Sequence, residues 1–333
     1  MAQLRIGVLG AARIAPTALI KPAAGVPEVT VAAIAARDPQ RARRFAAKHR
    51  IATVHDSYQA VLDDPDIDAV YNPLPNALHA PWTLKAIAAG KHVLCEKPFT
   101  SNAVEARTVA EAAAASGLVV MEAFHYRHHP LASRMREICA SGELGTIGSI
   151  DVAMCFPLPR FSDIRYSYPL GGGAMMDAGC YTVNCLRLLG DGLLGDGQPE
   201  VVSAQATRHS PLIDRAMTAQ LRFPDGAEGR ITASMWSRKL LAISARVVGD
   251  QGELRVLNFV APHIYHRMTI KTASGTFHEK VRGEHSYTYQ LRAFADAVLH
   301  GGPVLPSADD AVVTMGLIDD VYRAADMPVR GES

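Results

Sequence analysis

Short apolar runs recur through the first third of the chain, separated by polar or alanine-rich segments. The runs cover residues 4–9, 29–35, 68–71, 92–95 and 118–121. Continuous apolar runs of this length are typical of strands that are buried on both faces, and their alternation with helical segments indicates βαβ units. This part of the chain therefore predicts a doubly wound, parallel sheet.

Helix boundaries are marked by capping signals in the same region. Asn76 precedes an alanine-rich segment as a candidate N-cap, and Gly90 stands where a glycine often ends a helix. Asn102 with Glu105 three residues later resembles a capping box, and Gly117 would close that helix. We therefore expect helices over roughly 77–89 and 103–116.

The pattern changes after about residue 125. Short, partly alternating segments follow, separated by turn signals, and they cover residues 148–156, 200–210, 216–223, 228–236, 243–249 and 268–275. Two helical segments at 288–301 and 307–325 complete the chain. We predict a Rossmann domain over residues 1–124 and an α+β domain over 125–333 with a large, mostly antiparallel open sheet. This prediction leaves open an alternative in which the C-terminal helices pack back on the first domain.

Composition and charge narrow the function classes. The 333 residues are 48% hydrophobic and 20% charged, with a net charge of +1 and no basic block, so we expect neither nucleic acid nor a membrane as partner. The first residues run straight into an apolar strand, which predicts a cytoplasmic protein without a leader. Five scattered cysteines form no C-x-x-C pair and are interpreted as small buried residues.

The first strand leads into a glycine- and alanine-containing turn. Gly10, Ala12 and Ala15 occupy the three positions of the dinucleotide fingerprint G-x-G-x-x-G, although alanine replaces the middle glycine that lets the backbone approach a pyrophosphate. An ordinary strand-turn-helix joint would explain this motif alone about as often. Its place at the first turn of an alternating pattern favours a dinucleotide.

The end of the second strand bears on the choice of cofactor. Arg37 and Arg41 lie one helical turn apart and can pair a 2′-phosphate, which favours NADP over NAD. The alternative is that both arginines are solvated residues of a helix start. Asp38 before Pro39 is interpreted as the N-cap of that helix.

Two further segments carry candidate chemistry. Residues 92–98 form an apolar run that ends in Glu96, Lys97 and a proline, so that the lysine is either part of a solvated turn or a catalytic group at the carboxyl edge of a sheet.

Three glycines at 171–173 provide a flexible approach to a helix on which Asp177 and Tyr181 share one face. A phenol is a poor base at neutral pH unless a cation stabilises its ionised form, and Lys97 is a candidate for that cation. An amphipathic helix with a buried tyrosine is an equally good explanation.

The histidines at 125, 128 and 129 are a weaker signal. On a helix, His125 and His129 would share a face and His128 would not, and no acidic residue stands at metal-ligand spacing. We expect no metal site, and we interpret these residues as belonging to a helix start or domain hinge.

Taken together, these motifs resemble the Gfo/Idh/MocA oxidoreductase family over nearly the whole chain. Within the family, the chain is most similar to the branch containing dimeric dihydrodiol dehydrogenase and NADP-dependent D-xylose dehydrogenase. The resemblance rests on the fingerprint, on AARD at 35–38, NP at 72–73 with His79, CEKP at 95–98, MEAFHYRHHP at 121–130 and GGGAMMDAGCY at 171–181.

The resemblance implies roles for individual residues. Lys97 matches the catalytic lysine, Tyr181 the proposed general acid/base and Asp177 the aspartate that binds substrate. Arg127, or alternatively His125, is implied in the substrate pocket. The residues implied at the cofactor are Gly10, Ala12, Arg13, Ile14, Arg37, Arg41, Asn72, Pro73, Asn76, His79, Glu96, Lys97 and Tyr287. Assembly as a homodimer or higher homo-oligomer through the C-terminal sheet is also implied.

The expected function is transfer of a hydride between NADP and a carbinol or carbonyl carbon of a sugar or cyclic diol, with Tyr181 as acid/base and Lys97 assisting. One alternative is a non-catalytic NADPH sensor or partner subunit. Another is a redox-neutral enzyme that keeps its nicotinamide tightly bound.

Overall fold

The computed structural model describes residues 3–332, and the chain divides into two compact units. The first unit contains the residues up to His125 together with Tyr287–Val312, and the second contains Tyr126–Ser286 with the residues from Val313 onward. The chain leaves the first unit after His125 and returns to it at Tyr287, the second residue of the helix Ser286–His300.

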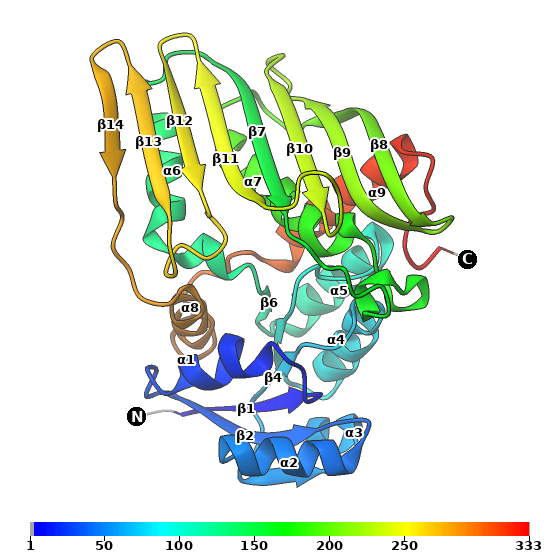
Figure 1. Ribbon diagram of the computed structural model, residues 1–333. Coiled ribbons are helices and arrows are strands. Elements are labelled where there is room, and N and C mark those ends of the chain that lie inside the picture. The colour runs from blue at the N-terminus through cyan, green and yellow to red at the C-terminus, as the bar shows by residue number, and fades with distance from the viewer. Residues whose placement is uncertain (1–2, 333) are drawn as a thin grey trace. The chain divides into compact units, whose positions relative to one another are not determined.

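A six-stranded parallel sheet forms the centre of the first unit (Figure 1). Its order is β3-β2-β1-β4-β5-β6, which is the doubly wound arrangement in which ligands bind outside the carboxyl ends of the strands. The strands are β1 (Leu4–Leu9), β2 (Val29–Ala35), β3 (Thr53–His55), β4 (Ala69–Asn72), β5 (His92–Cys95) and β6 (Val120–Glu122). The predicted Rossmann fold is confirmed, and only the three-residue β3 lacked a sequence signal.

Helices connect these strands, and two of them, α2 and α5, begin at caps that the sequence predicted. The Asp38 carboxylate accepts hydrogen bonds from two backbone amides at the start of its helix, and Asn102 accepts one from the Glu105 amide. Gly117 ends the second of these helices with φ of +68°, as predicted. The helices of this unit are α1 (Lys21–Ala23), which follows a π-helical turn over Pro16–Ile20, α2 (Pro39–His49), α3 (Tyr58–Leu62), α4 (His79–Ala88), α5 (Ala103–Ser116) and α8 (Ser286–His300).

One predicted cap is wrong. Helix α4 begins at His79 without a side-chain cap, and Asn76 lies in the preceding 3-10 turn, Asn76–Leu78. The proline before Asn76 has an extended ψ of 148°, so the chain turns there and reaches the helix one turn later than the sequence indicates. Gly90 has φ of +73° just after the last helical residue, as expected of a helix terminator.

An eight-stranded sheet dominates the second unit (Figure 1). Its order is β14-β13-β12-β11-β7-β10-β9-β8, and every pair is antiparallel except β7 with β10. The predicted mostly antiparallel sheet is therefore confirmed. Its strands are β7 (Ile147–Cys155), β8 (Glu200–Ser210), β9 (Ile213–Arg222), β10 (Glu228–Ser234), β11 (Ala242–Gly249), β12 (Gly252–Leu257), β13 (Arg267–Thr272) and β14 (Gly275–Glu279).

One face of this large sheet is covered and the other is open. Helices α6 (Pro130–Ala140) and α7 (Cys180–Gly190) pack against one face, as Figure 1 shows. Buried and exposed residues alternate along strands such as β9 and β10, which leaves a polar open face. Helix α9 (Ala308–Ala324) begins in the first unit and ends in the second.

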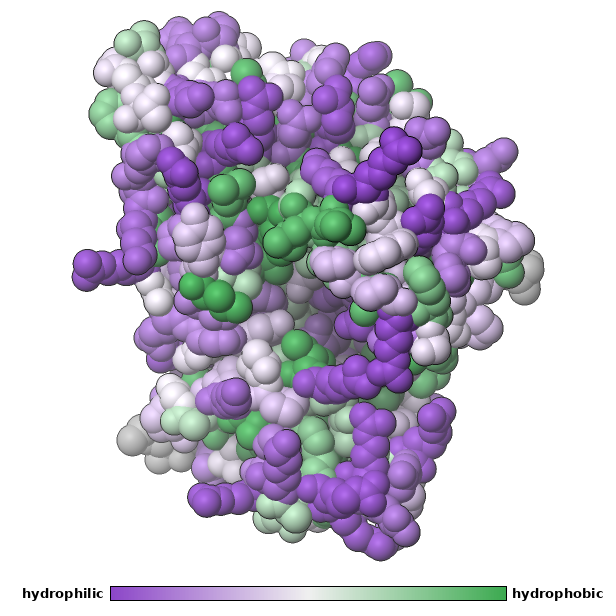
Figure 2. Space-filling view, in the orientation of Figure 1, coloured by the Kyte–Doolittle hydropathy of each residue, from purple (hydrophilic) through white to green (hydrophobic). Residues whose placement is uncertain are grey.

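The surface and the cysteines agree with the composition. In Figure 2, hydrophilic residues cover most of the face in view, and apolar side chains form small groups. All five cysteines are buried free thiols, as predicted. Among the described residues, no helix has the length and apolar character that a bilayer crossing requires.

Candidate functional site

The first strand of the parallel sheet ends in a turn that requires glycine. Gly10 has φ of +100°, and a Cβ added there would lie 3.1 Å from Cδ2 of Leu74. Its amide donates to the Ala35 carbonyl at 2.7 Å, which ties the turn to the end of β2. Ala15 is fully buried and Ala12 is partly exposed. The turn therefore has the glycine geometry and close helix packing that a bound dinucleotide needs.

Charged residues at the end of β2 have separate tasks. Asp38 uses its carboxylate to cap α2, accepting from the amides of Gln40 and Arg41 at 2.9 and 3.2 Å. The Arg41 Nη2 donates to the Ala11 carbonyl at 2.7 Å, so this guanidinium lies against the first turn. Arg37, which directly precedes Asp38 in the sequence, is exposed. The cationic side chains and the turn fit a phosphate-bearing dinucleotide, whose phosphates they would hold.

Asn72 and His79 form part of the packing at the end of β4. Asn72 is fully buried, and its Nδ2 donates to the His79 carbonyl at 3.1 Å and to Thr83 Oγ1 at 3.2 Å. The two ring nitrogens of His79 lie 2.7 Å from the carbonyl oxygens of Leu74 and Pro98. Burial lowers the pKa of His79 to about 4, and the two carbonyls oppose that shift. These side chains connect the loops after β4 and β5.

The segment that follows β5 is built into the protein. Glu96 is 8% exposed, and its Oε1 accepts a hydrogen bond of 2.7 Å from the hydroxyl of Tyr71. Burial, reinforced by this carboxylate, raises the pKa of Tyr71 well above its usual value. The amide of Phe99 donates to Oε1 of the buried Glu122 at 2.9 Å. Glu96 is therefore buried rather than solvated, and the partly buried Lys97 follows it at the carboxyl edge of the sheet.

Asp177 is held by an arginine that the sequence did not single out. It lies in a π-helical turn, Met175–Gly179, that continues into α7. The Arg165 Nε donates to Asp177 Oδ2 at 2.9 Å, and Arg165 Nη1 contacts Asp163 Oδ1 at 3.1 Å. Asp177 is the main cause of the raised pKa of Arg165. No sequence signal marked Arg165, because the course of the loop at 157–168 does not follow from a periodic pattern.

Tyr181 lies one helical turn after Asp177 and is 5% exposed. Its ring centroid is 6.0 Å from that of Tyr126, whose hydroxyl donates to Asn184 Oδ1 at 2.5 Å. Arg127 follows Tyr126 in the 3-10 turn His125–His128. The second unit thus brings together the predicted carboxylate and phenol on one helix.

The predicted residues fall into two groups, one in each unit. Gly10, Arg37 and Lys97 follow neighbouring parallel strands of the first unit, and Asn72 ends another, so that all four share the carboxyl edge of the sheet. Tyr287 belongs to the same unit, where its ring stacks on His125 at 3.8 Å with an interplanar angle of 27°. The group in the second unit consists of Asp177, Tyr181 and Arg127.

The neighbouring histidines serve the local structure. His129 caps α6 by accepting from the Leu131 amide at 3.1 Å. Within residues 3–332, no group of three or more His, Cys, Asp or Glu residues is placed to hold a metal ion.

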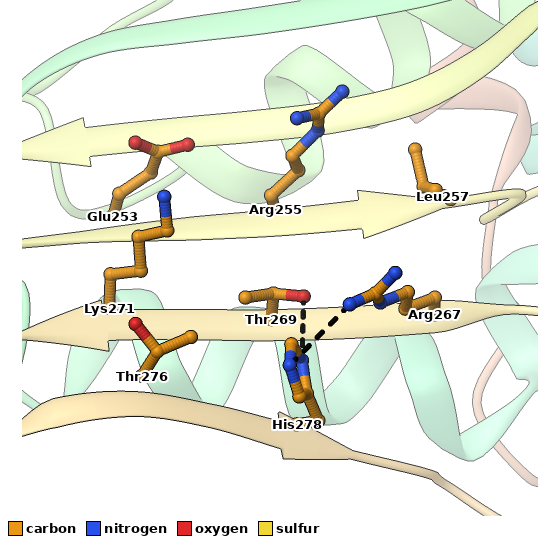
Figure 3. Close-up of a pocket in the computed structure, with 8 residues that line it drawn as sticks. All are labelled: Glu253, Arg255, Leu257, Arg267, Thr269, Lys271, Thr276 and His278. Carbon is orange, nitrogen blue, oxygen red and sulfur yellow. Dashed lines mark hydrogen bonds between the residues drawn. The ribbon is translucent and has the colours of Figure 1, made fainter.

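A polar groove lies on the open face of the large sheet, and none of the predicted site residues lines it. Figure 3 shows side chains from β12, β13 and β14 standing on this face. The Thr269 hydroxyl lies 3.1 Å from Nδ1 of His278. The groove is lined by Glu253, Arg255, Leu257, Arg267, Thr269, Lys271, Thr276 and His278.

Fold and site geometry together define a protein of the dinucleotide-binding Rossmann class with an added α+β domain. Residues 4–124 match a family model described as an oxidoreductase family with an NAD-binding Rossmann fold. Residues 132–255 match the GFO/IDH/MocA C-terminal domain. The chain belongs to the Gfo/Idh/MocA oxidoreductase family, as the motifs indicated.

Relatives include named dehydrogenases and reductases. The chain is 36% identical to the NADP-dependent D-xylose 1-dehydrogenase 2 of Haloferax volcanii, over 97% of this chain and 98% of the relative. It is 33% identical to the trans-1,2-dihydrobenzene-1,2-diol dehydrogenase of Macaca fascicularis, over 69% of this chain and 67% of the relative. A 3-ketoreductase from Actinomadura kijaniata, solved with NADP and TDP-benzene, is 31% identical with a TM-score of 0.89, covering 97% of this chain and 98% of that one.

Proposed function

We propose that this chain is an NADP-dependent oxidoreductase that interconverts a carbinol and a carbonyl group on a sugar or cyclic diol. The observation that carries the proposal is the fixed Glu96-Lys97 segment at the carboxyl edge of the parallel sheet, the edge that also carries the Gly10 turn. The similarity to a D-xylose dehydrogenase and to a dihydrodiol dehydrogenase supports the substrate class.

The residues at the end of β2 support NADP over NAD. An NAD enzyme commonly uses an acidic residue here to bind the ribose 2′-hydroxyl. In this chain, Asp38 is engaged in capping α2, and Arg37 is exposed beside it. A guanidinium suits the 2′-phosphate of NADP, because it donates charge-assisted hydrogen bonds in a planar fork. The xylose dehydrogenase and the 3-ketoreductase are both associated with NADP by name.

Three side chains carry the proposed chemistry. NADP, held at the carboxyl edge of the parallel sheet by the Gly10 turn and Arg37, would supply the hydride acceptor for the substrate carbon. In the oxidation direction, the C–H and O–H bonds of the carbinol break, and the hydroxyl proton passes to Tyr181 and then to solvent. Lys97 orients the substrate oxygen and favours the ionised phenol, because a nearby cation stabilises the charged form. Asp177, fixed by Arg165, accepts a hydrogen bond from a neighbouring hydroxyl of the substrate.

The proposal is tested with purified protein, NADP and a panel of aldoses, inositols and cyclic diols, followed by absorbance of the reduced nicotinamide. Lys97→Met should lower kcat by about a hundredfold or more, in the range typical of a lost acid-base group. The matched control is Lys85→Met, which removes an exposed ammonium that lies over the Trp82 ring. If no substrate reduces NADP, or if both lysine variants behave alike, the proposal fails.

We further propose that the enzyme acts in the cytoplasm and assembles as a homodimer through the open face of its large sheet. Five free thiols suit a reducing compartment. The open face carries Lys271 opposite Glu253 on the neighbouring strand and Arg255 two residues further along, so that like surfaces can pair opposite charges about a two-fold axis. Light scattering of the purified protein should give the mass of two chains, and a monomer mass at micromolar concentration would contradict the dimer.

A further inference from the structure

A buried polar cluster lies beneath the glycine segment that precedes Asp177. Asp214 comes from β9, Tyr322 from α9 and Arg330 from the C-terminal segment, and all three are 0% exposed. Arg330 Nη2 donates to Asp214 Oδ1 at 2.8 Å, and the Tyr322 hydroxyl donates to the same oxygen at 3.0 Å. The guanidinium carbon also lies 4.1 Å from the centroid of the Tyr322 ring. Residues far apart in sequence therefore meet at one point of the second unit.

This cluster is bonded directly to the backbone that carries Asp177. Arg330 Nε donates to the Gly172 carbonyl at 2.6 Å. The amide of Met175 donates to Asp214 Oδ2 at 2.7 Å, and the amide of Asp177 donates to the Gly173 carbonyl at 3.0 Å. Asp214 thus accepts from an amide at the helix start, while Arg330 holds the segment just before it.

Close packing explains two of the three glycines, Gly172 and Gly173, where the sequence indicated a flexible approach. All three are buried. Gly173 has φ of +138°, and an added Cβ would lie 2.7 Å from both Arg330 Nη2 and the Tyr322 hydroxyl and would overlap Asp214 Oδ1. A Cβ on Gly172 would lie 2.6 Å from the Arg165 carbonyl. The glycines let the backbone approach the cluster and the arginine that binds Asp177.

The energetics argue for a role beyond stability. A fully buried ion pair loses the hydration of both charges, and apolar side chains of similar volume often give equal or greater stability in the same space. Three donors converge on Asp214 here, so its carboxylate holds two chain segments in one geometry. Catalysis requires such precision, because a misplacement of about 1 Å can lower the rate by about a hundredfold.

We propose that Asp214, Tyr322 and Arg330 are positioning residues that fix the start of the helix bearing Asp177 and Tyr181. This inference rests on the proposed function, because it assigns the cluster a task in the same reaction. None of the three side chains contacts the substrate in this account. Their effect is transmitted through the backbone of residues 172–177.

Two conservative variants test the inference. Tyr322→Phe removes one hydrogen bond to Asp214 and keeps the ring beside the guanidinium. Arg330→Lys keeps the charge but loses the fork that binds Gly172 and Asp214 together. The control is Arg208→Lys, an exposed arginine whose Nη2 donates at 2.7 Å to the carbonyl of Asp326, a residue outside the glycine segment. Each protein is compared by steady-state kinetics, NADP binding and hydrogen exchange.

We expect both variants to exchange faster than wild type in a peptide covering residues 171–181, with no change in a β12 peptide of the same unit. We also expect kcat to fall roughly ten- to a hundredfold with an unchanged Kd for NADP, Arg330→Lys showing the larger effect. The control should match wild type in every measurement.

Faster exchange with unchanged kcat would overturn the inference, as would unchanged exchange at 171–181. A general rise in exchange that includes the β12 peptide would show that the cluster is only structural. If the wild type fails to reduce NADP with every substrate of the panel, the proposed function fails instead. That outcome is distinguishable, because the exchange measurement needs no activity.

Discussion

Substitution of Gly10 by alanine perturbs the first turn with the smallest possible side chain. The backbone there has φ of +100°, which side chains other than glycine rarely adopt. A residue held in such a region costs about 1–3 kcal/mol. The new methyl group would also lie 3.1 Å from Cδ2 of Leu74, a tight contact that the end of this side chain relieves by a small shift. We therefore expect the free energy of unfolding to fall by about 1–3 kcal/mol.

Gly90→Ala is the matched control for this variant. Gly90 has φ of +73°, and an added Cβ would meet no atom within 4 Å. It should lose about 1–2 kcal/mol of stability through the backbone alone. The two variants differ in place, because Gly10 forms the turn at the carboxyl end of β1, whereas Gly90 ends α4.

The assay that separates them is titration with NADPH followed by its fluorescence, beside urea denaturation of each protein. Gly10→Ala should bind at least about tenfold more weakly, equivalent to about 1.4 kcal/mol, because the turn must move to accept the methyl group. Gly90→Ala should bind like wild type. If folded Gly10→Ala binds NADPH as tightly as wild type, the first turn does not hold the cofactor and the reasoning is refuted.

Three further predictions follow from single side chains. Arg37→Ala should weaken NADP binding by about tenfold or more and leave NAD binding unchanged, and equal affinities of the wild type for NADP and NAD would contradict this. Gln290 is 0% exposed, and neither of its amide atoms has a hydrogen-bond partner among the described residues, so Gln290→Met should raise the urea midpoint, whereas a fall would show that the amide is satisfied. Burial lowers the pKa of His128 from 6.5 to about 4, so the unfolded chain binds the proton first. Stability should therefore decline by up to about 3 kcal/mol as the pH falls from about 6.5 to 4, and His128→Leu should flatten that decline in acid titrations of unfolding.

The sequence was most informative where strands are buried on both faces. Residues 4–9, 29–35 and 92–95 read as apolar runs and form β1, β2 and β5 with the predicted bounds. The three-residue strand β3 is too short to give a period, and its first residue is exposed. Parallel pairing of β7 with β10 depends on contacts between segments about eighty residues apart, which no local pattern specifies.

In the candidate site, too, contacts between residues close in sequence were predicted, whereas contacts between residues distant in sequence were not. Asp38 and Asn102 cap their helices through bonds within three residues, and both were predicted. Arg165 reaches Asp177 from a loop without periodicity, and Arg330 reaches Gly172 across 158 positions. The roles of such residues cannot be predicted from a local pattern, because their side chains bind residues that are distant in sequence and come close only in the folded chain.

The central claim is that the protein oxidises a sugar or diol with free NADP as the acceptor. Its most direct test is the stoichiometry of turnover, measured as NADPH formed against substrate consumed with the purified protein. We predict that the two amounts are equal and that NADPH accumulates over many turnovers. Consumption of substrate without release of NADPH would indicate a redox-neutral enzyme with a permanently bound nicotinamide. Binding of NADPH without consumption of any substrate would indicate a sensor, and either result would contradict the claim.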